Sequence, residues 1–373
     1  MTVDLDLTDE QRMLADAVGA LLDKRYDANA RLALLESADG WSRELWKQYA
    51  ELGLLGLTID EQYGGAGMGA DELAVVAEAF GRALVLEPFF ASTVLAGPLV
   101  ARVGTPEQKS QLLPRLASGE VVLALAATEP GSRWSFTDVA TTAQRDGDTW
   151  TISGEKVAVV GGDSAHTLVV TAALPDGGVG LFLVDGDAVR RNPVTLQDGT
   201  RGADVLLSAT AAQPLGAPVA ADDHLAAVID ETTAMLCAEA VGAMDRMLWL
   251  TVDYLKTRVQ FGQPIAVFQA LQHRAADMYV SLEQARSMAL LARLALHEDD
   301  VADRRKAVQA AKIQIDIAAR HVGQEAIQLH GGIGMTMEYP VGHYLKRTAV
   351  IAKTFADTDL LLESVGTGAG LLG

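Results

Sequence analysis

The chain has 373 residues, of which 49% are hydrophobic and 21% charged, so it can form two or three domains with large cores. Lys and Arg number 30 and Asp and Glu 49, and the net charge of −19 disfavours binding to nucleic acid or an anionic membrane surface. Cys237 is the single cysteine, which excludes a disulfide framework and a Cys-rich zinc site.

No apolar run reaches the roughly 18 residues that a membrane-spanning helix needs. The first nine residues carry three acids and no base, unlike a signal peptide. We therefore expect a cytoplasmic protein without membrane insertion, and we predict no metal site.

The first third of the chain has a helical pattern. Thr8 and Gln11 have the spacing of a capping box, with a hydroxyl at the N-cap and an amide three residues later. The Gly-rich segment 64–67 ends this pattern before a predicted helix over 70–83. A further helix is expected to begin at Thr105, since a proline follows it at the first helical position.

From Val121 the pattern changes to short runs rich in Val, Thr and Gly, typical of strands. A hairpin turn is predicted at 145–148, with Asp-Gly at its centre. No helical pattern separates the runs, which argues against a Rossmann sheet and favours a small antiparallel β domain. The predicted strands lie within 121–126, 149–152, 168–171, 180–184 and 205–207.

From about Asp223 the helical period returns and continues almost to the C-terminus. The sequence thus predicts a multi-domain α+β protein. We expect an N-terminal helical domain over 1–120, a middle antiparallel β domain over 121–222 and a C-terminal helical bundle over 223–373.

Three segments carry a resemblance to a known family. Residues 258–269 read RVQFGQPIAVFQ, residues 328–335 read QLHGGIGM, and residues 128–131 read TEPG. The three motifs occur in the order and at the spacing of the acyl-CoA dehydrogenase family, and the helix–strand–helix order agrees across nearly the whole chain. The sequence is therefore identified as a member of that family.

The resemblance implies a fold of an N-terminal helical domain, a β-barrel-like middle domain and a C-terminal four-helix bundle. It implies a tetramer that binds FAD and acyl-CoA, removes two hydrogens across Cα–Cβ and passes electrons to an acceptor protein. FAD would lie across a subunit interface. One subunit's β domain would hold the isoalloxazine ring, and its neighbour's bundle would hold the pyrophosphate and adenosine.

The resemblance also assigns cofactor contacts to residues of the bundle. The Arg258 guanidinium suits a pyrophosphate because its hydrogen bonds would be charge-assisted. Gly331 and Gly332 lack Cβ atoms and let backbone approach the cofactor, although they can also end a helix. Phe268 suits either the adenosine end or ordinary core packing, and His330 is expected to be a packed histidine. The assigned residues are Arg258, Gln260, Phe261, Phe268, Gln269, Gln328, Leu329, His330, Gly331 and Gly332.

The positions of the catalytic base depart from the family. The reaction needs a carboxylate to take the α-proton, and the family places this Glu at one of two positions. Ungapped alignment puts Phe355 at one of them and Thr232, 26 residues before Arg258, at the other. A phenyl ring has no proton acceptor, and a threonine hydroxyl is too weak a base without an activator.

Three nearby carboxylates could substitute. On a helix, Glu231 is rotated by roughly 100° from Thr232, and Glu239 lies roughly 10 Å further along the axis. Asp357 lies two places past Phe355 and has a shorter side chain. Glu231 is the best candidate because an alignment shift of one residue would place it correctly.

The flavin-ring side departs as well. The family has small residues after TEPG, where this chain has Arg133 and Trp134. The family's Trp against the flavin and Thr near its N5 edge are replaced by Ala158 and Val160. Loss of the stacked ring alone would cost on the order of 1 kcal/mol beyond area burial.

The base and ring-side residues are therefore lost together, while the bundle motifs are kept. This pattern resembles the smaller subunit of α2β2 heterotetramers, in which a homologous larger subunit carries the catalytic Glu. Such pairs take bulky or unusual acyl-CoA substrates, including steroid side chains and dicarboxylates. Two alternatives remain: a self-sufficient homotetramer that uses Glu231, and a flavin-free protein that binds acyl-CoA or acts as a scaffold.

Overall fold

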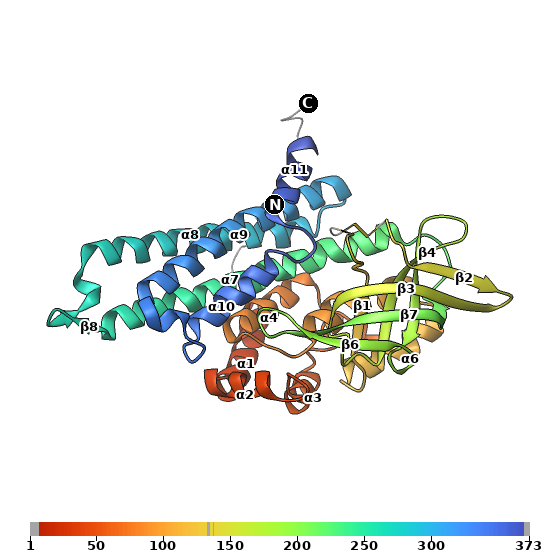
Figure 1. The fold of residues 1–373 in the computed structure, drawn as a ribbon, viewed down its shortest axis with the longest axis horizontal. Coiled ribbons are helices and arrows are strands. Elements are labelled where there is room, and N and C mark those ends of the chain that lie inside the picture. Colours follow the sequence, from red (N-terminus) through yellow and green to blue (C-terminus); the bar gives the residue numbers. More distant parts are fainter. Residues whose placement is uncertain (1–6, 133–134, 137, 369–373) are drawn as a thin grey trace. The chain divides into compact units, whose positions relative to one another are not determined.

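The computed structural model describes residues 7–132, 135, 136 and 138–368 (Figure 1). Arg133 and Trp134 therefore lie outside the described residues. The chain forms two compact units. The bundle unit comprises residues 1–33, 70–85 and 233–373, and the sheet unit comprises residues 34–69 and 86–232. No helix in the described ranges is long and apolar enough to cross a membrane.

The bundle unit is built on long helices. α8 packs against α9, and α9 packs against α10 and α11. Ion pairs join α7 to α8 through Asp245 and Arg286, and to α10 through Glu239 and Arg347. The elements are α1 (Asp9–Arg25), α4 (Ala70–Ala83), α7 (Asp222–Thr257, from residue 233 in this unit), β8 (Val259–Gln260), β9 (Gln263–Pro264), η4 (Ile265–Val267), α8 (Gln269–Ala295), α9 (Val301–His330), η5 (Gly331–Met335), α10 (Val341–Ile351) and α11 (Thr358–Gly368).

The predicted helix starts are confirmed. Thr8 and Gln11 form a reciprocal capping box at the start of α1, and Thr105 and Gln108 form another at the start of α6 (Pro106–Ala117). The helix expected over 70–83 is α4 (Ala70–Ala83). α2 (Ala28–Glu36) spans the boundary between the two units.

The sheet unit holds a seven-stranded sheet in the order β1-β4-β2-β3-β7-β5, with β6 paired to β7. β5 pairs with both β7 and β4, so the sheet closes on itself. Its elements are α3 (Arg43–Glu51), η1 (Glu61–Tyr63), η2 (Phe90–Ala96), α5 (Gly97–Val103), α6 (Pro106–Ala117), β1 (Leu123–Ala126), β2 (Thr142–Asp146), β3 (Thr149–Val160), β4 (Thr167–Ala173), β5 (Val179–Asp185), η3 (Gly186–Ala188), β6 (Arg190–Thr195) and β7 (Arg201–Pro214).

Two details of the sheet differ from the sequence prediction. β4 pairs in parallel with β1, and with β2 at one residue pair, whereas the other pairings are antiparallel. The long β2–β3 excursion between β1 and β4 makes the parallel pairing possible. The hairpin turn also shifts by one residue: Asp146 pairs with Thr149, so Gly147 and Asp148 form the loop.

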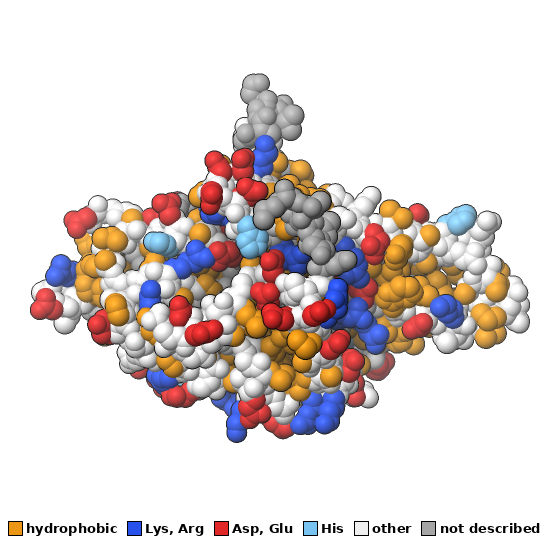
Figure 2. Space-filling view, turned by 180° about the vertical axis from the view of Figure 1, so that it is seen from behind, with side chains coloured by type: hydrophobic (Ala, Val, Ile, Leu, Met, Phe, Trp, Pro, Cys, Tyr) orange, Lys and Arg blue, Asp and Glu red, His pale blue; other side chains and the backbone are white. Residues whose placement is uncertain are grey.

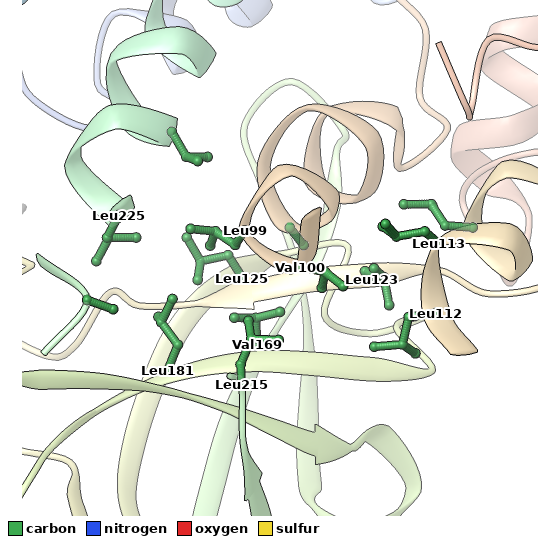
Figure 3. Close-up of a cluster of buried hydrophobic side chains, with 14 of the residues drawn as sticks. Leu99, Val100, Leu112, Leu113, Leu123, Leu125, Val169, Leu181, Leu215 and Leu225 are labelled. Carbon is green, nitrogen blue, oxygen red and sulfur yellow. The ribbon is translucent and has the colours of Figure 1, made fainter. Parts of the chain in front are cut away.

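Side chains of β1 alternate between two hydrophobic clusters of the sheet unit. Leu123 and Leu125 face α5 and α6, in the cluster that Figure 3 shows together with Leu99 and Leu113. Ala124 and Ala126 belong to a second buried cluster. Successive strand side chains point to opposite faces, so this short apolar strand serves both cores.

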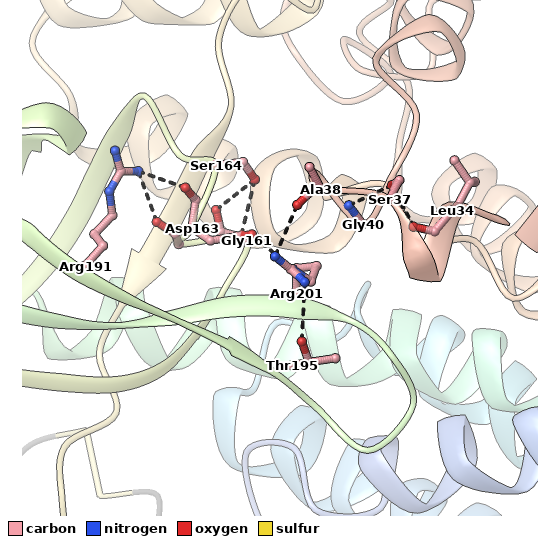
Figure 4. Close-up of polar contacts among 11 residues, drawn as sticks. Leu34, Ser37, Ala38, Gly40, Gly161, Asp163, Ser164, Arg191, Thr195 and Arg201 are labelled. Carbon is pink, nitrogen blue, oxygen red and sulfur yellow. Dashed lines mark hydrogen bonds and ion pairs between the residues drawn. The ribbon is translucent and has the colours of Figure 1, made fainter. Parts of the chain in front are cut away.

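Two half-buried arginines, Arg191 and Arg201, hydrogen-bond to backbone carbonyls in loops of the sheet unit (Figure 4). Arg191 donates from one Nη to the carbonyl oxygens of Gly162, Asp163 and Ala165, at 2.9–3.2 Å. Arg201 donates to the carbonyl of Ala38 at 3.2 Å. The Arg191 contacts hold the turn that follows β3, and the Arg201 contact joins β7 to the segment that follows α2.

Candidate functional site

The motif at residues 258–269 forms the hairpin at the end of α7. The strands β8 and β9 are joined by Phe261 and Gly262, which both have positive φ, of 54° and 79°. A two-residue loop with two positive φ values matches the right-handed twist of a hairpin. The Phe261 side chain is 89% exposed, and its ring meets the edge of Phe268 at a centroid distance of 6.0 Å.

Arg258 lies at the base of this hairpin. Its carbonyl oxygen accepts a hydrogen bond from Ile265 N at 2.8 Å, which fixes the backbone. Its side chain is exposed, and it forms no ion pair within the described parts of the chain. Gln260 and Gln269 are exposed as well, whereas Phe268 is half-buried.

The motif at residues 328–335 ends α9. Gln328 is exposed, and Leu329 and His330 are buried. His330 Nδ1 lies 2.7 Å from the carbonyl oxygen of Ala326. The His330 ring lies 4.5 Å from the Tyr254 ring. Burial lowers the pKa of His330, so the imidazole is neutral at physiological pH.

The packing of His330 supports a structural role for this residue. Tyr254 belongs to α7, four residues before Arg258, and it stacks on a residue at the end of α9. The contact therefore places the two motifs at the same end of the bundle unit. Sequence reasoning predicted a packed histidine here.

The two glycines after His330 leave an open backbone. Gly331 has φ 62° and ψ −141°, a conformation that only glycine adopts readily. A Cβ at Gly331 or Gly332 would meet no atom within 4 Å. No packing contact within the described residues explains a glycine at position 332. A molecule that lies against this surface could therefore contact the Gly332 backbone directly.

Hydrophobic side chains are exposed around both motifs. Figure 2 shows hydrophobic side chains gathered toward the end of the bundle that carries β8. Exposed apolar side chains gathered on one surface indicate an interaction surface. The exposed hydrophobic residues within and beside the two motifs are Val259, Phe261, Val267, Ile333, Met335 and Met337.

Thr232, which aligns with one of the family's two positions for the catalytic base, is not free to accept the substrate proton. Thr232 is 1% exposed, and its hydroxyl lies 2.7 Å from the carbonyl oxygen of Val228 and 3.2 Å from that of Val94. Its proton is engaged with backbone acceptors, as is usual for Thr within a helix. The neighbouring Glu231 is half-buried and forms an ion pair with Arg102.

Phe355, which aligns with the family's other position for the catalytic base, has no carboxylate either. Phe355 is half-buried with φ 66°. Asp357 accepts a hydrogen bond from Leu360 N at 3.0 Å at the start of α11, and this bond lowers the carboxyl pKa. Glu239 is buried and accepts two hydrogen bonds from Arg347, at 2.6 and 2.8 Å. These two carboxylates have structural partners within the bundle unit.

Residues 156–160 of β3, which align with the family's flavin-ring contacts and are called the ring-side segment, contain no aromatic side chain. Ala158 sits in a β-bulge between Lys156 and Val159, with φ 50°. It is exposed, and its N–H donates to Asp204 Oδ1 at 2.9 Å. Val160 is half-buried. Neither residue supplies a stacking surface or a hydroxyl.

A buried ion pair behind this segment was missed by sequence reasoning. Lys156 Nζ lies 2.7 Å from Glu129 Oε1 and 2.8 Å from Thr171 Oγ1. Burial lowers the pKa of Lys156 to about 8, although Glu129 opposes the shift. The pair ties the TEPG segment to β3. A lysine within an apolar strand was the only sequence signal for it.

The described residues fit FAD on one side only. The bundle end offers a cation without an acidic partner, an open glycine backbone, an exposed ring and exposed amides, which suit a pyrophosphate and adenosine. The ring side offers a methyl group at Ala158, which cannot stack on an isoalloxazine. Within the described residues, the bundle end therefore has the donor set that suits this cofactor, and Ala158 and Val160 do not add to it.

Comparison with known proteins agrees with this site. Family models of the acyl-CoA dehydrogenase N-terminal, middle and C-terminal domains match residues 8–120, 124–207 and 225–354. The acyl-CoA dehydrogenase fadE12 of Mycobacterium bovis is 35% identical over 322 residues, 80% of each chain. The acyl-CoA dehydrogenase IpdE2 of Mycolicibacterium smegmatis is 31% identical over 343 residues, 91% of this chain and 93% of that protein.

Solved structures show the same fold. A variant of the Tcur3481–Tcur3483 steroid ACAD has a TM-score of 0.88 and 31% identity, over 98% of this chain and 99% of that one. The ChsE4–ChsE5 complex of Mycobacterium tuberculosis has a TM-score of 0.90 and 24% identity over the full length of both chains, a likeness in fold. The chain therefore belongs to the acyl-CoA dehydrogenase family of FAD-dependent oxidoreductases that act on CH–CH bonds, and it has their fold of N-terminal helical, middle β and C-terminal helical domains.

Proposed function

We propose that this chain is the smaller subunit of an α2β2 acyl-CoA dehydrogenase. It would supply the pyrophosphate and adenosine contacts of FAD to a larger homologous subunit, which holds the flavin ring and the catalytic Glu. The observation that carries the proposal is the one-sided fit to FAD. The contact residues would be Arg258, Gln260, Phe261, Phe268, Gln269, Gln328, Leu329, His330, Gly331 and Gly332.

The bundle end supports this role because its features are directed outward. Arg258 and Phe261 are exposed, and the backbone at Gly332 is uncovered. The Arg258 guanidinium forms no ion pair within the described residues, and the Phe261 ring is 89% exposed, so both gain few contacts from this chain. Both gain contacts if a second subunit brings a pyrophosphate and an apolar surface against them.

The three candidate carboxylates of this chain also support the proposal. Glu231 pairs with Arg102, Glu239 with Arg347, and Asp357 caps α11. A general base must reach the substrate proton within hydrogen-bond distance and be free to accept it. Each of these groups already has a structural partner, which favours a base supplied by the partner chain.

The relatives add support for the subunit type and for the substrate class. The Tcur3481–Tcur3483 and ChsE4–ChsE5 structures are each named after two chains, and the first is described as a steroid ACAD. We infer that this chain also works with a second, homologous chain. Its acyl-CoA substrate would then carry a bulky acyl group such as a steroid side chain.

The reaction divides between the two subunits. The partner's Glu would take the α-proton of the thioester. When bound, FAD would supply the hydride-accepting chemistry for the β-hydrogen and the route for electrons to an acceptor protein. This chain's part is to hold the dinucleotide through Arg258 and the open glycine backbone, which orients the cofactor without taking part in the bond changes.

We also propose domain boundaries at 1–120, 121–222 and 223–373. The family models end and begin close to these positions, at 120, 124, 207 and 225. Limited proteolysis with mass spectrometry would test the boundaries, because cleavage concentrates in exposed connections between domains.

Co-expression tests the proposal. The chain would be produced alone and with the family member encoded by a neighbouring gene, and turnover would be measured with a dye acceptor. We expect turnover only for the pair, and expect it to disappear when the partner's Glu is changed to Gln. Turnover by the lone chain that Glu231→Gln abolishes would establish the homotetramer instead. Acyl-CoA binding without flavin in either sample would favour the flavin-free protein.

A further inference from the structure

We propose that Tyr254 and Tyr339 are positioning residues for FAD, because their rings pack on opposite neighbours of one histidine ring, that of His330. Neither tyrosine belongs to the two motifs of the candidate site, at residues 258–269 and 328–335. The three rings, called the ring cluster, would set the spacing between these motifs and thereby the affinity for the dinucleotide. The inference rests on the proposed function, since it concerns how the same FAD contacts are held in place.

The ring cluster is compact. The centroid of the His330 ring lies 4.5 Å from that of Tyr254, at an interplanar angle of 31°, and 4.7 Å from that of Tyr339, at 51°. The two tyrosine rings meet edge to face at 6.2 Å. His330 is 3% exposed, whereas both tyrosines are half-buried. Aromatic pairs at these distances attract each other beyond the burial of their area, so the cluster resists separation of the segments that carry the rings.

A hydrogen bond fixes the imidazole within the cluster. His330 Nδ1 lies 2.7 Å from the carbonyl oxygen of Ala326, and Nδ1 carries the proton because a carbonyl can only accept. Burial lowers the pKa of His330, so the ring packs between the tyrosines without a charge to desolvate. The imidazole cannot rotate away without losing this hydrogen bond, and it therefore holds the end of α9 in a fixed relation to both tyrosines.

Tyr254 connects the cluster to Arg258. It lies one helical turn before Arg258, whose backbone N–H donates to the Tyr254 carbonyl oxygen at 2.8 Å. The Arg258 carbonyl oxygen in turn accepts from Ile265 N at 2.8 Å, which ties the hairpin to the same turn. The Arg258 side chain is exposed, so its reach toward a pyrophosphate depends on where its backbone is held. Loss of the Tyr254 ring would free this end of α7 from the end of α9.

Tyr339 closes the loop that contains the open glycines. The chain leaves His330 through Gly331, which has φ 62°, and it returns to the His330 ring at Tyr339. Between these points Gly334 packs on His330, since a Cβ at Gly334 would lie 3.0 Å from the His330 Cβ. The loop therefore wraps around His330, and both of its ends are held there. Backbone N–H groups bind a phosphate only when they point at it, so fixed loop ends favour binding by the glycine backbone.

The ring cluster gives both parts of the cofactor contact a common support. Arg258 follows α7, whereas the glycine backbone follows α9. A ligand that is held by two segments binds more tightly when their spacing is set in advance, because ordering them on binding costs free energy. The cluster supplies this spacing before FAD arrives.

The FAD affinity of the assembled enzyme, measured by flavin fluorescence on dilution, tests the inference. Tyr254→Leu and Tyr339→Leu should each weaken binding by about 3- to 10-fold, which corresponds to the loss of an aromatic pair. Tyr254→Phe and Tyr339→Phe keep the rings and should bind FAD as the wild type does. Tyr279→Leu removes a tyrosine that is 49% exposed on α8 and is the matched control, with no expected effect.

A double-variant comparison separates positioning from a general loss of stability. If Tyr254 acts through Arg258, the double variant Tyr254→Leu, Arg258→Ala should bind FAD no more weakly than Arg258→Ala alone. Tyr339 acts through the glycine loop, so Tyr339→Leu should add its full effect to that of Arg258→Ala. Additive losses for Tyr254→Leu, or a loss in Tyr279→Leu equal to that in Tyr254→Leu, overturn the inference.

The same variants distinguish this inference from the proposed function. Unchanged FAD affinity in Arg258→Ala would refute the proposed contact and the positioning role with it. A loss in Arg258→Ala with none in Tyr254→Leu and Tyr339→Leu would refute the positioning role alone. If Tyr254→Leu does not fold, Tyr254→Met keeps apolar volume without a ring and should show the same loss. Thermal unfolding of each variant establishes that affinities are compared between folded proteins.

Discussion

Gly81 meets the backbone of Glu239 directly, because a Cβ at Gly81 would lie 1.9 Å from the Glu239 carbonyl oxygen. The contact is reciprocal. A Cβ at Gly242 would lie 2.0 Å from the carbonyl oxygen of Glu78. α4 and α7 therefore cross with their backbones in contact. This close crossing brings Arg82, on α4, to Asp245, on α7, where the two form an ion pair.

Gly81→Ala should destabilise the protein, because the added methyl group must separate two backbones that cannot yield as a flexible side chain would. We expect a loss of about 2–3 kcal/mol or more in the free energy of unfolding. Chemical denaturation monitored by circular dichroism measures it. Gly19→Ala is the matched control, since it also lies within a helix but has open space. It should be neutral or slightly stabilising, and equal effects of the two changes would refute the close crossing.

Cys237 should resist alkylation in the folded protein. Burial raises the pKa of its thiol to about 12, from an ordinary value of 9.0, so almost no thiolate exists at pH 8. Iodoacetamide labelling at pH 8 should be slow in buffer and fast in denaturant. The raised pKa also means that the unfolded thiol ionises first, so this group's contribution to stability falls as the pH rises above about 9. Rapid labelling of the folded chain would contradict this burial.

Arg258→Ala should release FAD from the assembled enzyme. A hydrogen bond to a charged group contributes about 1.5–3 kcal/mol, which corresponds to a loss of about 10- to 150-fold in FAD affinity. Arg258→Lys should retain part of the affinity because it keeps the charge but not the bidentate geometry. Arg190→Ala, on the exposed edge strand β6, is the control. Flavin fluorescence after dilution measures the release, and unchanged affinity in Arg258→Ala would exclude the proposed contact.

Glu231→Gln should leave the turnover of the assembled pair nearly unchanged. The carboxylate pairs with Arg102 on a partly exposed surface, where such a pair contributes about 0–1 kcal/mol to stability. Initial rates at saturating acyl-CoA, compared with the partner's Glu→Gln variant, measure the effect. A loss of turnover by a factor of about a thousand from Glu231→Gln would identify this residue as the base.

Local sequence signals predicted the helices well. Capping residues and prolines fix a helix start within a few residues, as at Thr8 and Thr105. Strands with polar sequences were missed. β6 contains Arg190, Asn192 and Pro193, and it is tolerated because it is an edge strand paired only to β7. Its structure depends on a neighbour distant in sequence rather than on an apolar pattern.

The candidate site shows the same difference between local sequence signals and contacts that depend on the fold. The bundle motifs are short contiguous segments, and the sequence alone predicted that His330 is packed. The pair of Glu129 and Lys156 joins residues 27 apart and exists only once the sheet has closed. The bulge at Ala158 likewise depends on its pairing with β7 and on Asp204, which no local spacing predicts.

The flavin content of the purified lone chain tests the central claim most directly. Absorbance near 450 nm, divided by the protein concentration, gives FAD per chain. We expect far less than one FAD per chain, and we expect one FAD per heterodimer when the partner is present. A lone chain that is yellow, carries one FAD per chain and turns over acyl-CoA would contradict the division of the site between two subunits.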